Sequence, residues 1–89
     1  MHVVEGFRIR EVLDEIIAVP VGEVSNIFSG IISLNAVGRF LFEQLTSDQT
    51  EDSLVAALCK EYEVEPAVAA ADVKEFLEHL RSAGLLVEE

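Results

Sequence analysis

The sequence has two histidines and one cysteine that could bind a metal ion or act as a nucleophile: His2, His79 and Cys59. No two of them have the i, i+3 or i+4 spacing that places two ligands on one helix face, so we expect no metal site. His79 falls on a helix face that should be solvated, without the base and orienting group that a nucleophilic site needs. Cys59 precedes Lys60 within a helical pattern, and we expect a small, partly buried thiol. The sequence therefore predicts a protein that is not an enzyme and that needs no metal or other cofactor.

A fourth candidate is Ser53, because Asp52-Ser53-Leu54 is the tripeptide on which acyl and peptidyl carrier proteins bear phosphopantetheine. Carrier proteins are also short and acidic, but they are helical throughout, whereas the first third of this chain has strand patterns. The simpler interpretation is that Ser53 lies in the first turn of a helix, where its hydroxyl helps to satisfy free backbone amides. A carrier function with phosphopantetheine on Ser53 is the alternative hypothesis.

The composition and charge of the chain limit the functions that it can have. The 89 residues are 51% apolar and carry a net charge of −11, which fits one folded domain that spans residues 1–89. A strongly negative surface repels phosphate backbones and anionic lipids, so we expect neither nucleic acid nor a membrane as a partner. The single cysteine and the absence of a signal-peptide pattern favour the cytoplasm.

Three strands are expected within residues 6–34. Apolar and polar residues alternate from Phe7 to Val12, as in a half-buried strand, and a tight turn follows. The β-branched run over residues 16–19 stops at Pro20, which has no N–H for a strand ladder. A second turn leads to a third strand over residues 30–34. The short connections predict an antiparallel meander.

Helical periodicity fills residues 35–84. Asn35 is a good N-cap, and apolar residues at helical spacing follow it. Thr50 can cap a second helix that has carboxylates in its first turn. Pro66 suits the first turn of a third helix, and Gly84 can end that helix in a left-handed conformation. The next three residues can return to the core, so the fold class is α+β: a three-stranded antiparallel meander followed by three helices.

The third strand is the candidate edge of this small sheet. An unpaired edge strand beside an apolar helical groove can capture an extended peptide. Gly30 has no side chain to obstruct an incoming backbone, and Ile27, Phe28 and Ile31 exceed what a small sheet buries on one face. Two interpretations stay open for these three residues: they complete the core, or they form part of a peptide-binding surface. The same edge could also pair with its own copy and give a homodimer.

The order of these patterns resembles the PqqD-like family, the peptide chaperones of pyrroloquinoline quinone synthesis, and the wider group of recognition elements for ribosomally made, modified peptides. The resemblance covers the chain from about Phe7 to Val87. Its strongest pieces are Ser33-Leu34-Asn35 and Ala71-Asp72-Val73-Lys74-Glu75-Phe76-Leu77-Glu78-His79-Leu80, closed by Gly84-Leu85-Leu86. Weaker pieces are Phe7-Arg8-Ile9-Arg10-Glu11, Thr50-Glu51-Asp52-Ser53-Leu54 and Glu61-Tyr62-Glu63-Val64.

The resemblance implies a winged-helix-like, non-catalytic domain that binds the leader segment of a precursor peptide. Such a domain presents the leader to a modifying enzyme, often a radical S-adenosylmethionine (radical SAM) enzyme, and the leader lies as an added strand beside the third strand. Carried onto this sequence, the strand contributors are Phe28, Ser29, Gly30, Ile31, Ile32 and Ser33, and the helix contributors are Asp72, Val73, Phe76, Leu77, Leu80 and Arg81. Residues 20–28 are more apolar than the family's usual hairpin, which leaves the register of the third strand open.

A winged-helix topology also permits DNA binding, which is the least favoured function for this chain. The third helix offers only Lys74 and Arg81 to phosphates and has acidic residues beside them. We expect the acidic helices instead to speed the encounter with a basic leader or with a basic patch on the enzyme.

Overall fold

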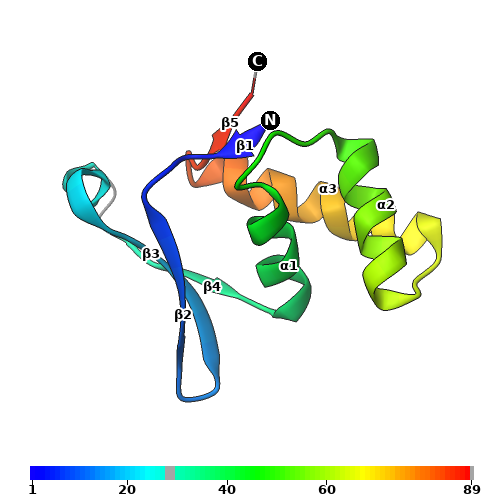
Figure 1. Cartoon of the computed structure of the whole chain (residues 1–89), viewed down its shortest axis with the longest axis horizontal. Helices are drawn as coiled ribbons and strands as arrows, with labels where there is room; N and C mark the ends of the chain where they lie inside the picture. The colour runs from blue at the N-terminus through cyan, green and yellow to red at the C-terminus, as the bar shows by residue number, and fades with distance from the viewer. Residues whose placement is uncertain (28–29, 89) are drawn as a thin grey trace.

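The chain folds into a small sheet and a group of three helices (Figure 1). The computed structural model describes residues 1–27 and 30–88. A three-stranded antiparallel sheet, β2-β3-β4, precedes the helices, which confirms the α+β prediction. The elements are β1 (His2–Val3), β2 (Phe7–Val12), β3 (Glu15–Pro20), the 3₁₀ helix η1 (Gly22–Asn26), β4 (Ile32–Leu34), α1 (Ala36–Gln44), α2 (Glu51–Tyr62), α3 (Pro66–Ser82) and β5 (Leu86–Val87).

In the sheet, β3 is central and β4 lies at an edge. β2 and β3 pair along their whole length around a two-residue turn, in which Leu13 has a φ of 58° and is 97% exposed. This hairpin points away from the helices (Figure 1). One face of the sheet packs against the core and contributes Phe7, Ile9, Ile16, Ala18 and Ile32.

The edge strand β4 is shorter than the sequence predicts, because it begins at Ile32 and not at Gly30. In the register that pairs Ala18 with Ile32, the residue opposite Gly30 would be Pro20. Proline has no N–H to donate, so the ladder ends before Gly30. The pairing of Ala18 with Ile32 defines the register of the third strand, which the sequence leaves open.

The residues that the sequence predicts as helix caps and first-turn residues hold these positions in the structure. The Asn35 side chain accepts a hydrogen bond from the Gly38 N–H at 2.7 Å, and Thr50 caps α2 in a capping box. Pro66 lies in the first turn of α3. Gly84 follows that helix with a φ of 74°, and the next residue donates its N–H to a carbonyl of the last turn at 2.9 Å. These caps fix the length of α3 and the place where the chain leaves it.

A second, two-stranded sheet of β1 and β5 is absent from the sequence-based prediction. Each strand has two residues, too few to show a strand period in the sequence. Val3 donates its N–H to the carbonyl of Leu45 at 2.9 Å, so β1 also ties the start of the chain to the end of α1. Leu85 is buried next to β5, as predicted for the segment that returns to the core.

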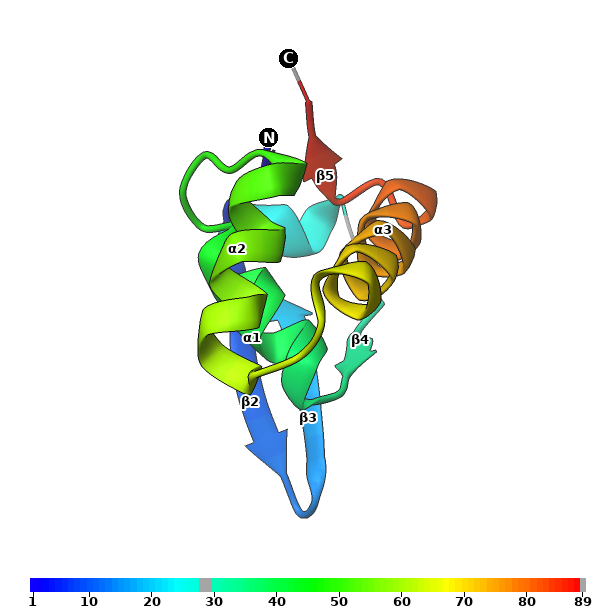
Figure 2. The same cartoon turned by 90° about the vertical axis from the view of Figure 1, so that its right-hand side faces the viewer.

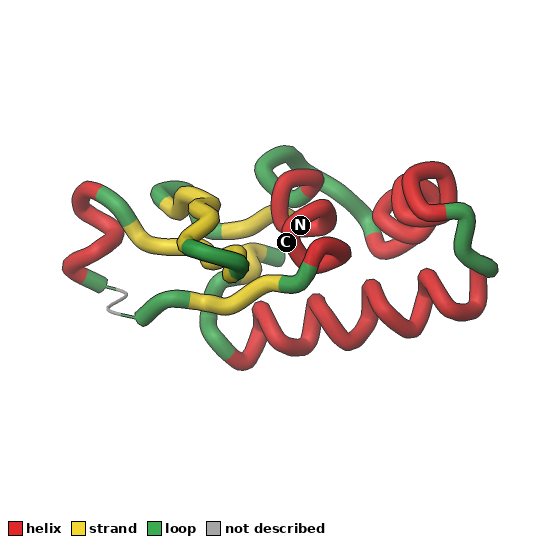
Figure 3. The backbone as a smooth tube through the Cα atoms, turned by 90° about the horizontal axis from the view of Figure 1, so that it is seen from below, coloured by secondary structure: helices red, strands yellow, loops and turns green. Residues whose placement is uncertain are grey.

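The core lies between the helices and one face of the sheet, and α3 runs along it (Figure 3). Its buried members are Val3, Ala18, Leu34, Leu41, Phe42, Leu45, Leu54, Leu58, Ala69, Val73, Leu77, Leu80 and Leu85. They come from all three helices and from both sheets, so the core holds α3 at a fixed position beside the edge strand. No helix in the described part of the chain has the length and apolar character needed to cross a bilayer.

Candidate functional site

A groove lies between the edge strand and the third helix. β4 runs beside α3, as Figure 2 and Figure 3 show. Between them is a hollow of about 530 Å³, which we call the central hollow. One wall comes from β4 and the start of α1: Ser33, Leu34, Asn35, Val37, Gly38 and Leu41. The other wall comes from α3: Asp72, Glu75, Phe76, Glu78, His79 and Ser82.

The side of α3 that faces the core does not take part in this groove. The sequence predicts Val73, Leu77 and Leu80 as peptide contacts, but their side chains are 0% exposed. The structure therefore assigns these three residues to the core. Apolar periodicity identifies the buried side of a helix, and a binding surface on the same helix has to lie outside that stripe.

A second stripe of α3 faces the groove. Asp72 and Phe76, both predicted from the sequence, line the central hollow, and so do Glu75, Glu78 and His79, which the sequence reasoning missed. Residues 72, 75, 76 and 79 have the i, i+3, i+4 and i+7 spacing of one helix face. The sequence does contain a pattern that could have identified them. It is a mostly polar stripe with one aromatic residue, adjacent to the apolar stripe that forms the core.

Phe76 of α3 lies close to Gly38 of α1 across the central hollow. Phe76 is half-buried and packs against the core. A Cβ atom at Gly38 would stand 3.3 Å from Cε1 of Phe76 and 3.2 Å from Oδ1 of Asn35. Gly38 thus lets the first turn of α1 approach the aromatic ring, and a side chain at this position would displace either the ring or the helix cap.

The groove continues past the end of β4 into a second hollow of about 300 Å³, the end hollow. It is lined by Phe7, Ile27, Gly30, Ile31, Ile32, Ala83 and Leu85. Ile27 is 77% exposed and Ile31 is 60% exposed, so these two residues do not complete the core and instead supply apolar surface. Phe28 and Ser29 lie outside the described residues. Ile32 of the end hollow adjoins Ser33 of the central hollow along β4, and Ala83 adjoins Ser82 after α3, so the two hollows are neighbours, and we refer to them together as the groove.

Comparison with known proteins gives a match over residues 9–86 to the family described as "Coenzyme PQQ synthesis protein D (PqqD)". The chain belongs to the PqqD family. The resemblance predicted from the sequence is thereby confirmed, and the PqqD match includes both β4 and α3.

One solved structure has a fold similar to that of this chain. The protein described as "TbiB1 in Complex with the TbiA(beta) Leader Peptide" matches with a TM-score of 0.74 and 22% sequence identity. The match covers 100% of this chain and 98% of the TbiB1 chain. A comparison with curated proteins gives no match.

Arg81 of this PqqD-family chain does not line the groove, although the sequence predicts it as a peptide contact. Its guanidinium pairs with Glu78 and, at 2.7 Å, with Glu88. The hydrogen bond from Arg81 lowers the pKa of the Glu88 carboxyl, and Glu88 in turn raises the pKa of Arg81. Arg81 therefore ties the segment after β5 to α3.

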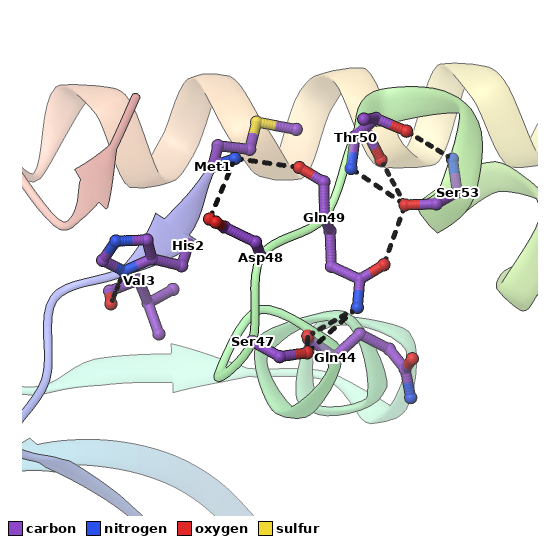
Figure 4. Close-up of polar contacts among 9 residues, drawn as sticks. All are labelled: Met1, His2, Val3, Gln44, Ser47, Asp48, Gln49, Thr50 and Ser53. Carbon is purple, nitrogen blue, oxygen red and sulfur yellow. Dashed lines mark hydrogen bonds and ion pairs between the residues drawn. The ribbon is translucent and has the colours of Figure 1, made fainter. Parts of the chain in front are cut away.

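Ser53 belongs to the capping box of α2 (Figure 4). Its Oγ accepts a hydrogen bond from the Thr50 N–H at 2.8 Å, and its own N–H donates to Thr50 Oγ1 at 3.0 Å. The Ser53 hydroxyl also donates to Gln49 Oε1 at 2.8 Å. These contacts fit the structural interpretation of the Asp-Ser-Leu tripeptide, and a sheet in front of the helices does not fit a carrier protein, which is helical throughout.

The remaining chemically active residues are separated from one another. Cys59 is half-buried in α2, and His79 is exposed on α3. Among residues 1–27 and 30–88, no three or more His, Cys, Asp or Glu side chains are grouped closely enough to hold a metal ion. Among the described residues, the structure brings together a groove and the edge strand β4 beside it.

Proposed function

We propose that this PqqD-family chain is an adaptor without catalytic activity of its own, which binds the leader segment of a ribosomally made precursor peptide. The observation that carries the proposal is the edge strand β4 beside the groove on α3. The protein of similar fold, TbiB1, is described in complex with a leader peptide, which supports the same use of the fold in this chain.

The leader binds as an additional strand on β4. An edge strand offers backbone N–H and C=O groups to an incoming strand, which gives affinity that does not depend on the peptide's side chains. Alternate side chains of the peptide, spaced roughly 6.6 Å apart, then face the groove, and the two hollows select among them. The strand contributors are Phe28, Ser29, Gly30, Ile31, Ile32 and Ser33, and the helix contributors are Asp72 and Phe76.

The adaptor presents the bound leader to a modifying enzyme, which we propose is a radical SAM enzyme. The whole chain, residues 1–89, acts as one domain in the cytoplasm, where ribosomal precursors are made. Without a peptide, the same edge of β4 can pair with a second copy of the chain. Leader binding then converts a homodimer into a complex of one adaptor with one peptide.

Calorimetric titration with the leader half of a precursor peptide encoded beside this chain tests the proposal. We expect binding with a Kd of about micromolar or tighter, corresponding to roughly −8 kcal/mol. Ile31→Asp places a charge in the end hollow and should abolish this binding. Val12→Asp is the matched control, because Val12 is 53% exposed at the hairpin tip, Ile31 is 60% exposed, and Val12 does not line the groove. The absence of binding tighter than millimolar for every neighbouring precursor would overturn the proposal.

A further inference from the structure

The charge of the central hollow identifies the class of leader that it takes. Building on the peptide-binding function proposed above, we infer that the groove selects leaders with a lysine or arginine two residues from an apolar anchor. The described lining of the central hollow contains no lysine or arginine, and its titratable members are Asp72, Glu75, Glu78 and His79.

Two of these acids are available to a ligand. Glu78 already pairs with Arg81. Within the described residues, the ion pairs leave out Asp72 and Glu75. Asp72 is half-buried and Glu75 is exposed at the groove. Because partial burial reduces the screening of a charge by water, a cation that reaches Asp72 interacts with it more strongly than with a fully solvated carboxylate.

The geometry places these acids one step from the apolar part of the groove. Phe76, Gly38 and Leu34 provide an apolar seat for one side chain of the added strand. The next side chain that faces the groove is two residues along the peptide, roughly 6.6 Å away. One turn of a helix rises about 5.4 Å, so a long basic side chain at that position reaches Asp72, one turn before Phe76, or Glu75, which lies between them on the same face of α3. An acidic side chain there meets repulsion from these carboxylates and from a chain of net charge −11.

Selection from a display library of random ten-residue peptides, with the full chain as bait, tests the inference. We expect lysine and arginine to be enriched over aspartate and glutamate by about two- to fivefold, two positions from an apolar residue, as for an exposed ion pair. Glu75→Gln should reduce this enrichment. Glu61→Gln on α2 is the matched control, because Glu61 is exposed, does not line the groove, and its replacement changes the net charge by the same amount.

The outcomes separate this inference from the function on which it rests. Selected peptides without basic enrichment, or enrichment that Glu75→Gln and Glu61→Gln reduce equally, would overturn the inference and leave peptide binding intact. A selection that returns no peptide would also overturn it. The titration with the neighbouring leader decides the proposed function independently, because that peptide is chosen by its gene and not by its charge.

Discussion

The two sides of α3 divide stability from recognition. One side carries Val73, Leu77 and Leu80, which are completely buried against the other helices. The neighbouring side carries Asp72 and Phe76, which line the groove beside β4. The two stripes lie next to each other on a helix of 17 residues, yet one is apolar throughout and the other is mostly polar. Substitutions on one side should therefore change the free energy of unfolding, and those on the other side should change peptide affinity.

The largest effect is expected on the core side. Leu77→Ala removes a fully buried side chain and leaves a cavity, which should lower the free energy of unfolding by about 2 to 5 kcal/mol. Urea unfolding followed by circular dichroism measures this loss. The exposed Glu75→Gln on the groove side is the comparison, and we expect it to change the free energy by less than about 0.5 kcal/mol. Equal losses for both variants would contradict the division between the two sides.

The next effect is expected on the groove side. Phe76→Ala removes the aromatic wall of the central hollow, and we expect the affinity for a bound leader to fall about tenfold or more, as for a buried aromatic anchor. Because Phe76 is only half-buried, its loss of stability should be smaller than that of Leu77→Ala. Titration of the folded variant measures the affinity. An unchanged affinity with a large loss of stability would place Phe76 with the core.

A helix outside the groove should show stability changes without affinity changes. Ser53→Ala removes one half of the capping box of α2, which should lower the free energy of unfolding by about 1 kcal/mol. Leader affinity should stay the same, because Ser53 does not line the groove. Urea unfolding and titration of the same variant check both statements. A fall in leader affinity at unchanged stability would show that Ser53 acts in binding.

The smallest effect is expected at the end of α3, where Arg81 meets Glu88. Glu88 has its pKa lowered by Arg81, so the pair stabilises the folded chain above the unfolded-state pKa of a glutamate. This contribution is lost as the pH falls through the lowered, folded-state value. Both side chains are exposed, which keeps the contribution small. Glu88→Gln should therefore cost more unfolding free energy near neutral pH than at the lowest pH where the chain stays folded. An equal cost at both pH values would contradict the assignment.

The sequence predicts the fold better than it predicts the groove. Helix ends follow from local chemistry, such as the caps at Asn35, Thr50 and Gly84. These residue types are typical of helix caps, so they can be recognised in the sequence. The groove depends on which side of α3 turns toward β4, and that orientation results from packing between distant segments. The apolar pattern of α3 marks its core side, and the peptide contacts that the family resemblance implies include the buried Val73 and Leu77 but not Glu75, which lines the groove.

Strand boundaries show the same limit of local information. Pro20 ends β3 as predicted, but its effect on β4 depends on a pairing register between residues that are distant in sequence. The sequence also does not show that Gly38 allows α1 to approach Phe76. Only the folded structure places Cε1 of Phe76 3.3 Å from where a Cβ atom at Gly38 would be. Long-range contacts therefore decide the details of the site.

The central claim, that a leader binds as an added strand on β4, is tested most directly by methylating single backbone nitrogens of the bound peptide. In an antiparallel or parallel strand pair, the N–H groups of alternate residues point toward the neighbouring strand. We expect methylation at every second position to abolish binding in titration and methylation at the positions between to preserve it. Losses that follow the side chains and show no alternation would contradict strand addition.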